Sequence, residues 1–178
     1  MHSDYELVNA VLGGDKAAFE QLVGRYERPV RAVCMSVLSD RHLAADAAQE
    51  AFVSAYRKLG TLRNAKTFAP WLLQIAKRCS LDILRTKRDE SPLSADIHAA
   101  RTDDNHQLDD QKQILLAAVM RLPDGDREAI MLRYFDGRSV QDVADITGKS
   151  VGTITKQLSR AHAKLKTILE KNQLETEK

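Results

Sequence analysis

The chain has 178 residues, of which 43% are hydrophobic, and its 27 Lys and Arg nearly balance its 25 Asp and Glu. This length allows one domain or two small ones with real hydrophobic cores. No apolar run is long enough for a signal peptide or a membrane span, so we expect a cytoplasmic protein without membrane insertion. With only 8 Gly and 4 Pro among many helix-forming residues, the composition predicts an all-α fold.

Charge is unevenly distributed along the chain. Lys and Arg number 14 against 9 Asp and Glu in residues 1–88, 2 against 7 in residues 89–113, and 11 against 9 in residues 114–178. The middle segment also contains Pro92 and has no sustained apolar period, so it is predicted to be an acidic, flexible linker. It would join two small helical domains, residues 1–88 and 114–178.

The first domain is predicted to contain helices over residues 4–11, 16–26, 29–38, 42–59 and 68–85. Gly13 and Gly14 would end the first helix, and Asp15 would cap the second. Pro29 suits the first turn of the third helix, where a missing amide hydrogen does no harm.

The helix over residues 42–59 gathers Asp46, Gln49 and Glu50 on one polar side. One interpretation is a docking surface for another protein, and the other is an ordinary solvated face. His42, Asp46 and Glu50 lie at steps of four and would also suit a metal, but one helix supplies too few ligands.

Nothing in the sequence indicates catalysis. Cys34 and Cys79 lack a Cys-x-x-Cys pair or a neighbouring His, so we expect buried thiols rather than a zinc site or a disulfide. The chain also has no P-loop, nucleophile elbow or Cys-His pair. We therefore predict a protein that is not an enzyme and needs no metal or cofactor.

A basic surface is predicted over the loop 61–67 and the helix that follows it, because Asp82 is the one acid opposing the cations of that helix. Such a surface suits single-stranded or duplex DNA. Trp71 has the helical spacing of a core anchor, with a base-stacking platform as the alternative. The candidate contacts are Arg63, Asn64, Lys66, Trp71, Lys77, Arg78 and Arg85.

The second domain begins with a helix that resumes near Gln111 and stops at Pro123, and Asp124 or Asp126 is expected to cap the next one. Residues 139–169 then form two amphipathic helices with a break at 147–150. Two helices separated by such a short turn predict a helix-turn-helix.

Four residues carry the prediction of the helix-turn-helix. Gly148 can take the left-handed conformation that ends a helix, and Ser150 can cap the next one. Small Ala144 would allow a close crossing, and Ile154 would fill the corner. Val151, Ile154, Leu158 and Ala161 are expected to point inward.

The outward face of the last helix carries short polar groups near its start and cations further along. A helix that enters the DNA major groove needs this arrangement, because small groups approach base edges while Lys and Arg meet phosphates. A helical hairpin with a solvated basic face is the alternative. The candidate contacts are Ser150, Gly152, Thr153, Thr155, Lys156, Ser159, Arg160 and Lys164.

Three motifs in this order resemble those of bacterial RNA polymerase sigma factors of the extracytoplasmic-function group. DAAQEAFVSAYRKL (46–59) is similar to the family's second conserved region, and FAPWLLQIAKRCSLDILR (68–85) is similar to the segment facing the minus-ten promoter element. LPDGDREAIMLRYFDGRSVQDVADITGKSVGTITKQLSRAHAKL (122–165) resembles the region-four helix-turn-helix that reads the minus-thirty-five element.

The resemblance implies a factor that binds core RNA polymerase and promoter DNA and directs transcription initiation. Asp46, Gln49 and Glu50 would dock on the polymerase clamp, and the loop 61–67 would meet a flipped base of the minus-ten strand. The acidic linker would either follow the nucleic-acid channel of the enzyme or serve as a solvated spacer. An anti-sigma factor is a candidate third partner.

The resemblance also marks three departures on the last helix, and one alternative function remains. Thr155, Gln157 and His162 occupy places that usually hold Lys or Arg, which implies fewer phosphate contacts. The alternative is a stand-alone transcription regulator whose helical first domain senses a signal or dimerises. Such a regulator would bind duplex DNA without polymerase.

Overall fold

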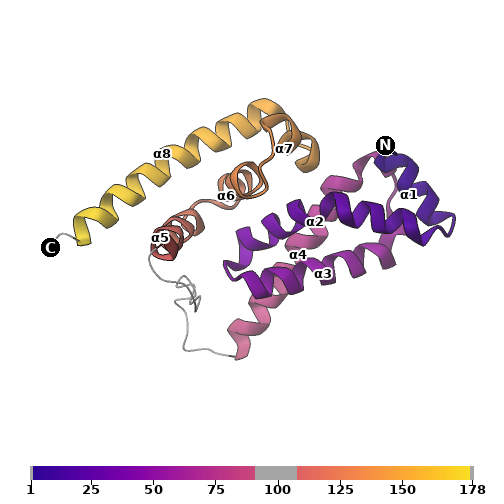
Figure 1. The fold of residues 1–178 in the computed structure, drawn as a ribbon, viewed down its shortest axis with the longest axis horizontal. Coiled ribbons are helices and arrows are strands. Elements are labelled where there is room, and N and C mark those ends of the chain that lie inside the picture. Colours follow the sequence, from indigo (N-terminus) through magenta and orange to yellow (C-terminus); the bar gives the residue numbers. More distant parts are fainter. Residues whose placement is uncertain (1, 91–107, 177–178) are drawn as a thin grey trace.

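The computed structural model describes residues 2–90 and 108–176, within which every regular element is helical. The first half contains α1 (Asp4–Leu12), α2 (Lys16–Leu38), α3 (Arg41–Lys58) and α4 (Phe68–Glu90), with 3-10 turns at Leu59–Thr61 and Ala65–Thr67. The second half contains α5 (Leu108–Met120), α6 (Asp124–Ile130), the π-helical turn η3 (Met131–Phe135), α7 (Val140–Thr147) and α8 (Val151–Thr176). The predicted all-α fold is confirmed (Figure 1).

In the first half, α2, α3 and α4 pack against one another and α1 lies against α2. A capping box between Ser3 and Glu6 starts α1. The carboxylate of Asp4 then accepts hydrogen bonds from Arg25 and from the hydroxyl of Tyr26 in α2. Burial raises the pKa of Tyr26, so its hydroxyl keeps the proton that it donates. This network fastens the N-terminal helix to the bundle.

The predicted break at Pro29 is wrong, because α2 runs as one helix from Lys16 to Leu38 with Pro29 inside it. A proline within a helix removes one backbone hydrogen bond and crowds the preceding turn. Here the buried stripe continues on both sides of it, through Leu22 and Tyr26 to Val30. Packing of this stripe against α3 and α4 keeps the helix continuous.

The predicted linker of residues 89–113 is shorter in the structure, because α4 extends to Glu90 and α5 already begins at Leu108. Residues 91–107 lie outside the described part of the chain. Asp109 and Asp110 counted as linker residues by charge, but acids are also favoured in the first turn of a helix. Composition alone therefore misplaces this boundary.

The two halves pack directly on one another. Helix α7 lies against α4, and α6 and η3 lie against α2 (Figure 1). At one contact, a Cβ added to Gly148 would lie 3.4 Å from the Cβ of Pro70 in α4. Buried apolar side chains of both halves form one continuous cluster. The end of α7 is thereby placed beside the start of α4.

We expect Ile154→Ala to lower the free energy of unfolding by about 2–5 kcal/mol, because it leaves a cavity at the corner between α7 and α8. Ile154 is fully buried, whereas Val151 is 41% exposed. Val151→Ala is therefore the matched control and should cost about 1 kcal/mol or less. Urea unfolding of the full chain measures both, and equal losses would contradict the corner-filling role of Ile154.

Candidate nucleic-acid interface

The turn between α7 and α8 has the geometry that the sequence predicts. Gly148 has a left-handed φ of 69°, and its amide donates to the carbonyl of Ala144. The Ser150 hydroxyl accepts from the amide of Thr153 at 3.2 Å and so caps α8. Ile154 and Ala144 are buried at the crossing. The helix-turn-helix is therefore present, and its second helix is rigidly capped.

A second cap fixes the start of α7. The Ser139 hydroxyl accepts from the amide of Asp142 at 3.0 Å, and the Asp142 carboxylate accepts from the Ser139 amide at 3.1 Å. Hydrogen bonds from the Ser139 hydroxyl and amide lower the pKa of Asp142. Both helices of the motif thus begin with a side-chain cap.

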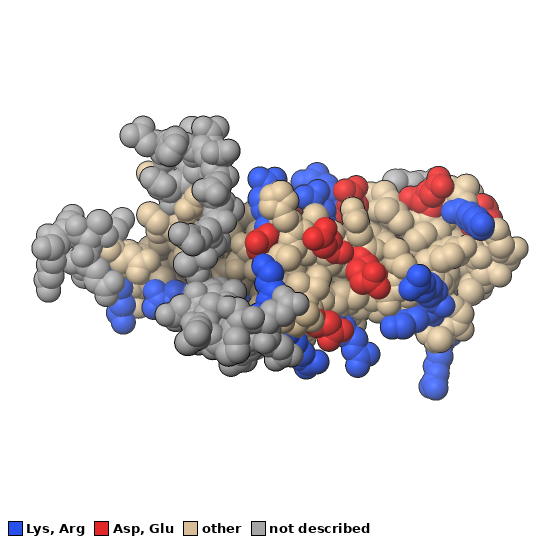
Figure 2. Space-filling view, turned by 90° about the horizontal axis from the view of Figure 1, so that it is seen from below, with Lys and Arg blue, Asp and Glu red and all other residues tan. Residues whose placement is uncertain are grey.

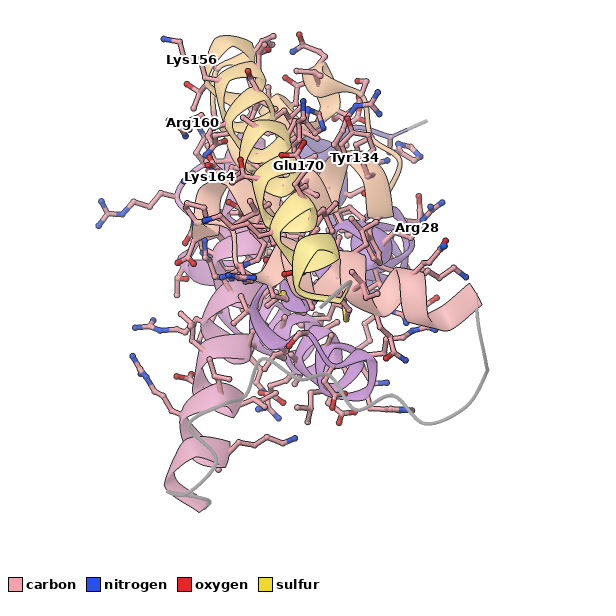
Figure 3. The ribbon with its side chains drawn as sticks, turned by 90° about the vertical axis from the view of Figure 1, so that its left-hand side faces the viewer. Arg28, Tyr134, Lys156, Arg160, Lys164 and Glu170 are labelled. Atoms are coloured by element: carbon pink, nitrogen blue, oxygen red, sulfur yellow. The ribbon has the colours of Figure 1, made fainter. Side chains whose placement is uncertain are left out.

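The candidate contacts on α8 form one exposed face. All eight are exposed, and Lys156, Arg160 and Lys164 follow one another along one side of the helix (Figure 3). Lys156 and Lys164 have no ion-pair partner among the described residues. Their ammonium groups are accessible to an anionic ligand.

Arg160 has a structural partner that the sequence does not reveal. Its guanidinium donates to the Asp126 carboxylate in α6 at 2.8 Å, and the Asp126 side chain is only 3% exposed. Asp126 therefore does not cap α6, and neither does Asp124, whose carboxylate instead accepts from Arg127 at 2.7 Å. Because 61% of the Arg160 side chain stays exposed, it holds α8 on α6 and still faces solvent.

Two residues of α8, Val151 and Gln157, differ from their predicted environment. Val151, at the first position of α8, is exposed rather than inward. Gln157 is 8% exposed, and a Cβ on Gly125 would lie 2.5 Å from its Nε2. The Nε2 of His162 lies 3.0 Å from the hydroxyl of Tyr134. Gln157 therefore packs inside the domain. Having Gln rather than Lys or Arg at this position does not remove a phosphate contact.

The candidate contacts of the loop before α4 are held in a turn that Asn64 caps. The Asn64 Oδ1 accepts from the amide of Lys66 at 3.0 Å, which leaves the amide NH2 group directed elsewhere. Arg63, Asn64 and Lys66 are all exposed. Helix α1 packs beside this turn and fixes its position.

The candidate contacts on α4 fall into two groups. Trp71 is half-buried against Phe68, with ring centroids 6.0 Å apart, as expected of a core anchor. Lys77 points towards the second half, where its Nζ lies 3.9 Å from Oε2 of Glu128. Arg78 and Arg85 are exposed, and Arg85 lies 3.5 Å from Asp82.

Asp46, Gln49 and Glu50 are all exposed on α3. Glu50 shares a groove of about 710 Å³ with Trp71 and Arg78 of α4. Acidic and basic side chains are interspersed on the underside of the first half (Figure 2). The polar face of α3 and the basic face of α4 thus adjoin.

Among the described residues, no group of three His, Cys, Asp or Glu, including the one on α3 with His42, Asp46 and Glu50, is placed to hold a metal ion. Burial raises the pKa of the Cys34 thiol to about 11, and it also raises the pKa of half-buried Cys79. Both thiols stay protonated near neutral pH. None of the described helices has the length and hydropathy of a membrane-spanning segment.

Comparison with known proteins finds similarity to the same protein family in both halves of the chain. Residues 22–90 match the family "Sigma-70 region 2", and residues 112–165 match "Sigma-70, region 4". The RNA polymerase sigma-H factor of Pseudomonas aeruginosa is 32% identical over 173 residues, covering 89% of both chains. The ECF RNA polymerase sigma-E factor of Escherichia coli K12 is 31% identical over 174 residues, covering 89% of this chain and 90% of that one.

Two solved structures are similar as well. CnrH, solved in complex with the cytosolic domain of CnrY, superposes with a TM-score of 0.65 at 24% identity, over 94% of this chain and 97% of that one, and supports the fold. The sigma factor RpoE of Bartonella quintana, in complex with the anti-sigma factor NepR, has a TM-score of 0.54 at 27% identity, over 85% and 96% of the two chains. With matched regions in both halves and relatives over nearly its whole length, the chain belongs to the extracytoplasmic-function group of the sigma-70 family of RNA polymerase sigma factors.

Proposed function

We propose that this protein binds core RNA polymerase in the cytoplasm and directs it to promoters, with one half for each promoter element. The observation that carries this proposal is the capped helix-turn-helix, whose second helix presents eight exposed candidate contacts. Region 2 and region 4 of the family occur in the same order in this chain. No catalytic step is needed, because the factor acts through binding.

The minus-thirty-five element would be read by the first turns of α8. Thr153, Thr155 and Lys156 lie near the capped end of α8 and can reach base edges in the major groove. Lys164, two turns further on, is placed for a backbone phosphate. Arg160 serves both α8 and α6, because Asp126 occupies part of its guanidinium.

The minus-ten element would be read by the turn before α4 and by the exposed cations of α4. A flipped base needs hydrogen-bond donors and acceptors at fixed positions. The cap on η2 fixes Asn64 in this way, because its Oδ1 is already engaged while its NH2 group remains to donate. Exposed Arg63 and Lys66 flank it as phosphate contacts.

Core polymerase would dock on the polar face of α3. Acidic side chains on this side of the first half are interspersed with Lys and Arg. Specific docking would therefore require a polymerase surface whose charges are arranged to complement this pattern. An anti-sigma factor is a proposed further partner, because the structure of the Bartonella quintana relative contains one.

Run-off transcription with core polymerase on a promoter library tests the proposed function as a whole. We expect transcripts that start at a shared promoter class and that require both the chain and the core enzyme. A gel shift distinguishes a sigma factor from a stand-alone regulator. A stand-alone regulator would bind duplex DNA equally well with and without core polymerase, whereas a sigma factor should bind promoters weakly without it.

Asp46→Lys/Glu50→Lys should weaken binding to core polymerase about tenfold or more, because it reverses the charge of the docking face. Folding should be unaffected, since both positions are exposed. Glu20→Lys/Glu27→Lys makes the same charge change on exposed positions of α2 and is the control. A pull-down titration that finds equal core affinity for both double variants would place docking elsewhere.

Lys156→Ala and Lys164→Ala should fail differently in holoenzyme titrations of promoter duplexes. Lys156→Ala should cost about 1–3 kcal/mol on the preferred upstream element and less on scrambled ones, because it removes base reading. Lys164→Ala should weaken all elements alike and reduce the salt slope by about one. The reverse pattern would mean that α8 enters the groove in another register.

Asn64→Ser should impair promoter opening more than closed-complex binding. Serine can still cap η2 through its hydroxyl, but it lacks the NH2 group that would bond a flipped base. Permanganate footprints of the melted region should weaken severalfold at equal promoter occupancy. Unchanged footprints would exclude Asn64 as the base-reading residue.

A further inference from the structure

An open recess lies beside the turn that contains Asn64. It has a volume of about 550 Å³, and we call it the α1 recess. Residues of α1 and its cap, of α2 and of η2 line it, namely Ser3, Asp4, Tyr5, Arg25, Tyr26 and Lys66. Lys66 belongs to both places, because it lines the α1 recess while its amide donates to the Asn64 Oδ1 at 3.0 Å. A DNA strand bound at the turn can therefore reach the α1 recess as well.

Hydrogen bonds hold the polar residues of the α1 recess in place. The Asp4 carboxylate accepts from the Arg25 guanidinium and from the Tyr26 hydroxyl, and Arg25 also donates to the carbonyl of His2 at 2.6 Å. Asp4 and Arg25 thereby neutralise each other, whereas Lys66 has no ion-pair partner among the described residues. The unpaired charge at the α1 recess is positive, which suits a strand that carries phosphates.

Tyr5 contributes an exposed aromatic ring to the α1 recess. It is 52% exposed, and within the described residues its side chain forms no hydrogen bond or ring contact. The other exposed tyrosine of the first half, Tyr56, packs edge-on against Phe19, with ring centroids 4.9 Å apart. Proteins that bind single strands use exposed aromatic rings next to cations to stack unpaired bases. Tyr5 and Lys66 offer this combination.

We propose that the α1 recess is a second base-binding site, in which Tyr5 stacks on an unpaired base next to the one held at Asn64. This inference rests on the proposed function, because it needs the melted minus-ten strand at the turn before α4. Lys66 would contact the phosphate that joins the two nucleotides, since it belongs to both places. Helix α1 thus takes part in holding the open promoter, in addition to supporting the turn.

Binding of a labelled non-template strand to the holoenzyme tests this site. The strand spans the melted region of a promoter recovered by run-off transcription. Tyr5→Leu should weaken its binding about tenfold, the loss expected for one stacked base, whereas Tyr5→Phe should keep the wild-type affinity. Leu12→Ala is the matched control and should bind normally, because Leu12 is also 52% exposed on α1. Equal affinities of Tyr5→Leu and Tyr5→Phe would overturn the proposal.

Strands that lack one base at a time then locate the stacked base. At one position, next to the position that Asn64→Ser affects, removal of the base should weaken binding to the wild type about tenfold. Removal of the same base should cost Tyr5→Leu nothing further, because the stacking is already lost. If the loss caused by Tyr5→Leu persists whichever base is removed, Tyr5 only supports the turn and the proposal is overturned.

Two measurements separate this inference from the proposed function. A wild-type chain that does not bind core polymerase would refute the proposed function and this inference with it. A wild-type holoenzyme that opens promoters, together with a Tyr5→Leu holoenzyme that binds the strand equally well, would overturn this inference alone. Circular dichroism should show that Tyr5→Leu keeps its helices, since the side chain is exposed. A loss of helix would assign Tyr5 a structural role and would also overturn the inference.

Discussion

Three carboxylates of the second half, Asp126, Glu128 and Asp136, are buried, and the arrangement of the surrounding helices follows from the cations that they need. Leaving such a charge unpaired in a protein interior costs several kcal/mol. Asp126 forms an ion pair with Arg160, which holds α8 on α6. Asp136 and Glu128 recruit cations from both halves, which brings the two matched sigma regions together.

This requirement divides the cations among the candidate DNA contacts into two kinds. Lys77 and Arg160 each pair with a buried acid, and 61% of the Arg160 side chain still faces solvent. Lys156 and Lys164 pair with no acid among the described residues and are exposed. The candidate contacts therefore combine two lysines without an ion-pair partner in the described part of the chain with cations that also hold helices together.

Local signals were sufficient to predict the helix-turn-helix. The left-handed Gly148, the Ser150 cap and the buried Ile154 all act within a few residues of one another, so the sequence pattern contains their geometry. The all-α fold was predictable for the same reason. How the two helical halves contact each other was not, because it depends on pairs such as Arg28 with Asp136, which are far apart in the chain.

The errors have the same physical origin. Pro29 is tolerated because tertiary packing holds the helix on both sides of it, and no local signal reports that packing. The partner of Arg160 is Asp126, 34 residues away, which the sequence indicated only as a candidate helix cap. The resemblance placed Gln157 where phosphate-contacting cations usually stand, whereas its spacing of three from Ile154 is that of a buried position. Charge and polarity predict exposure on average, and they fail where a specific partner is present.

The buried Gln157 fills the space between α8 and α6 beside Gly125. Its Nε2 comes so near Gly125 that a Cβ there would lie 2.5 Å away, so a side chain at position 125 would require the amide end of Gln157 to move. The missing side chain of Gly125 thus leaves room for a buried polar group beneath the reading helix. The first turns of α8 are therefore supported by residues inside the domain, on the side that faces away from the candidate DNA contacts.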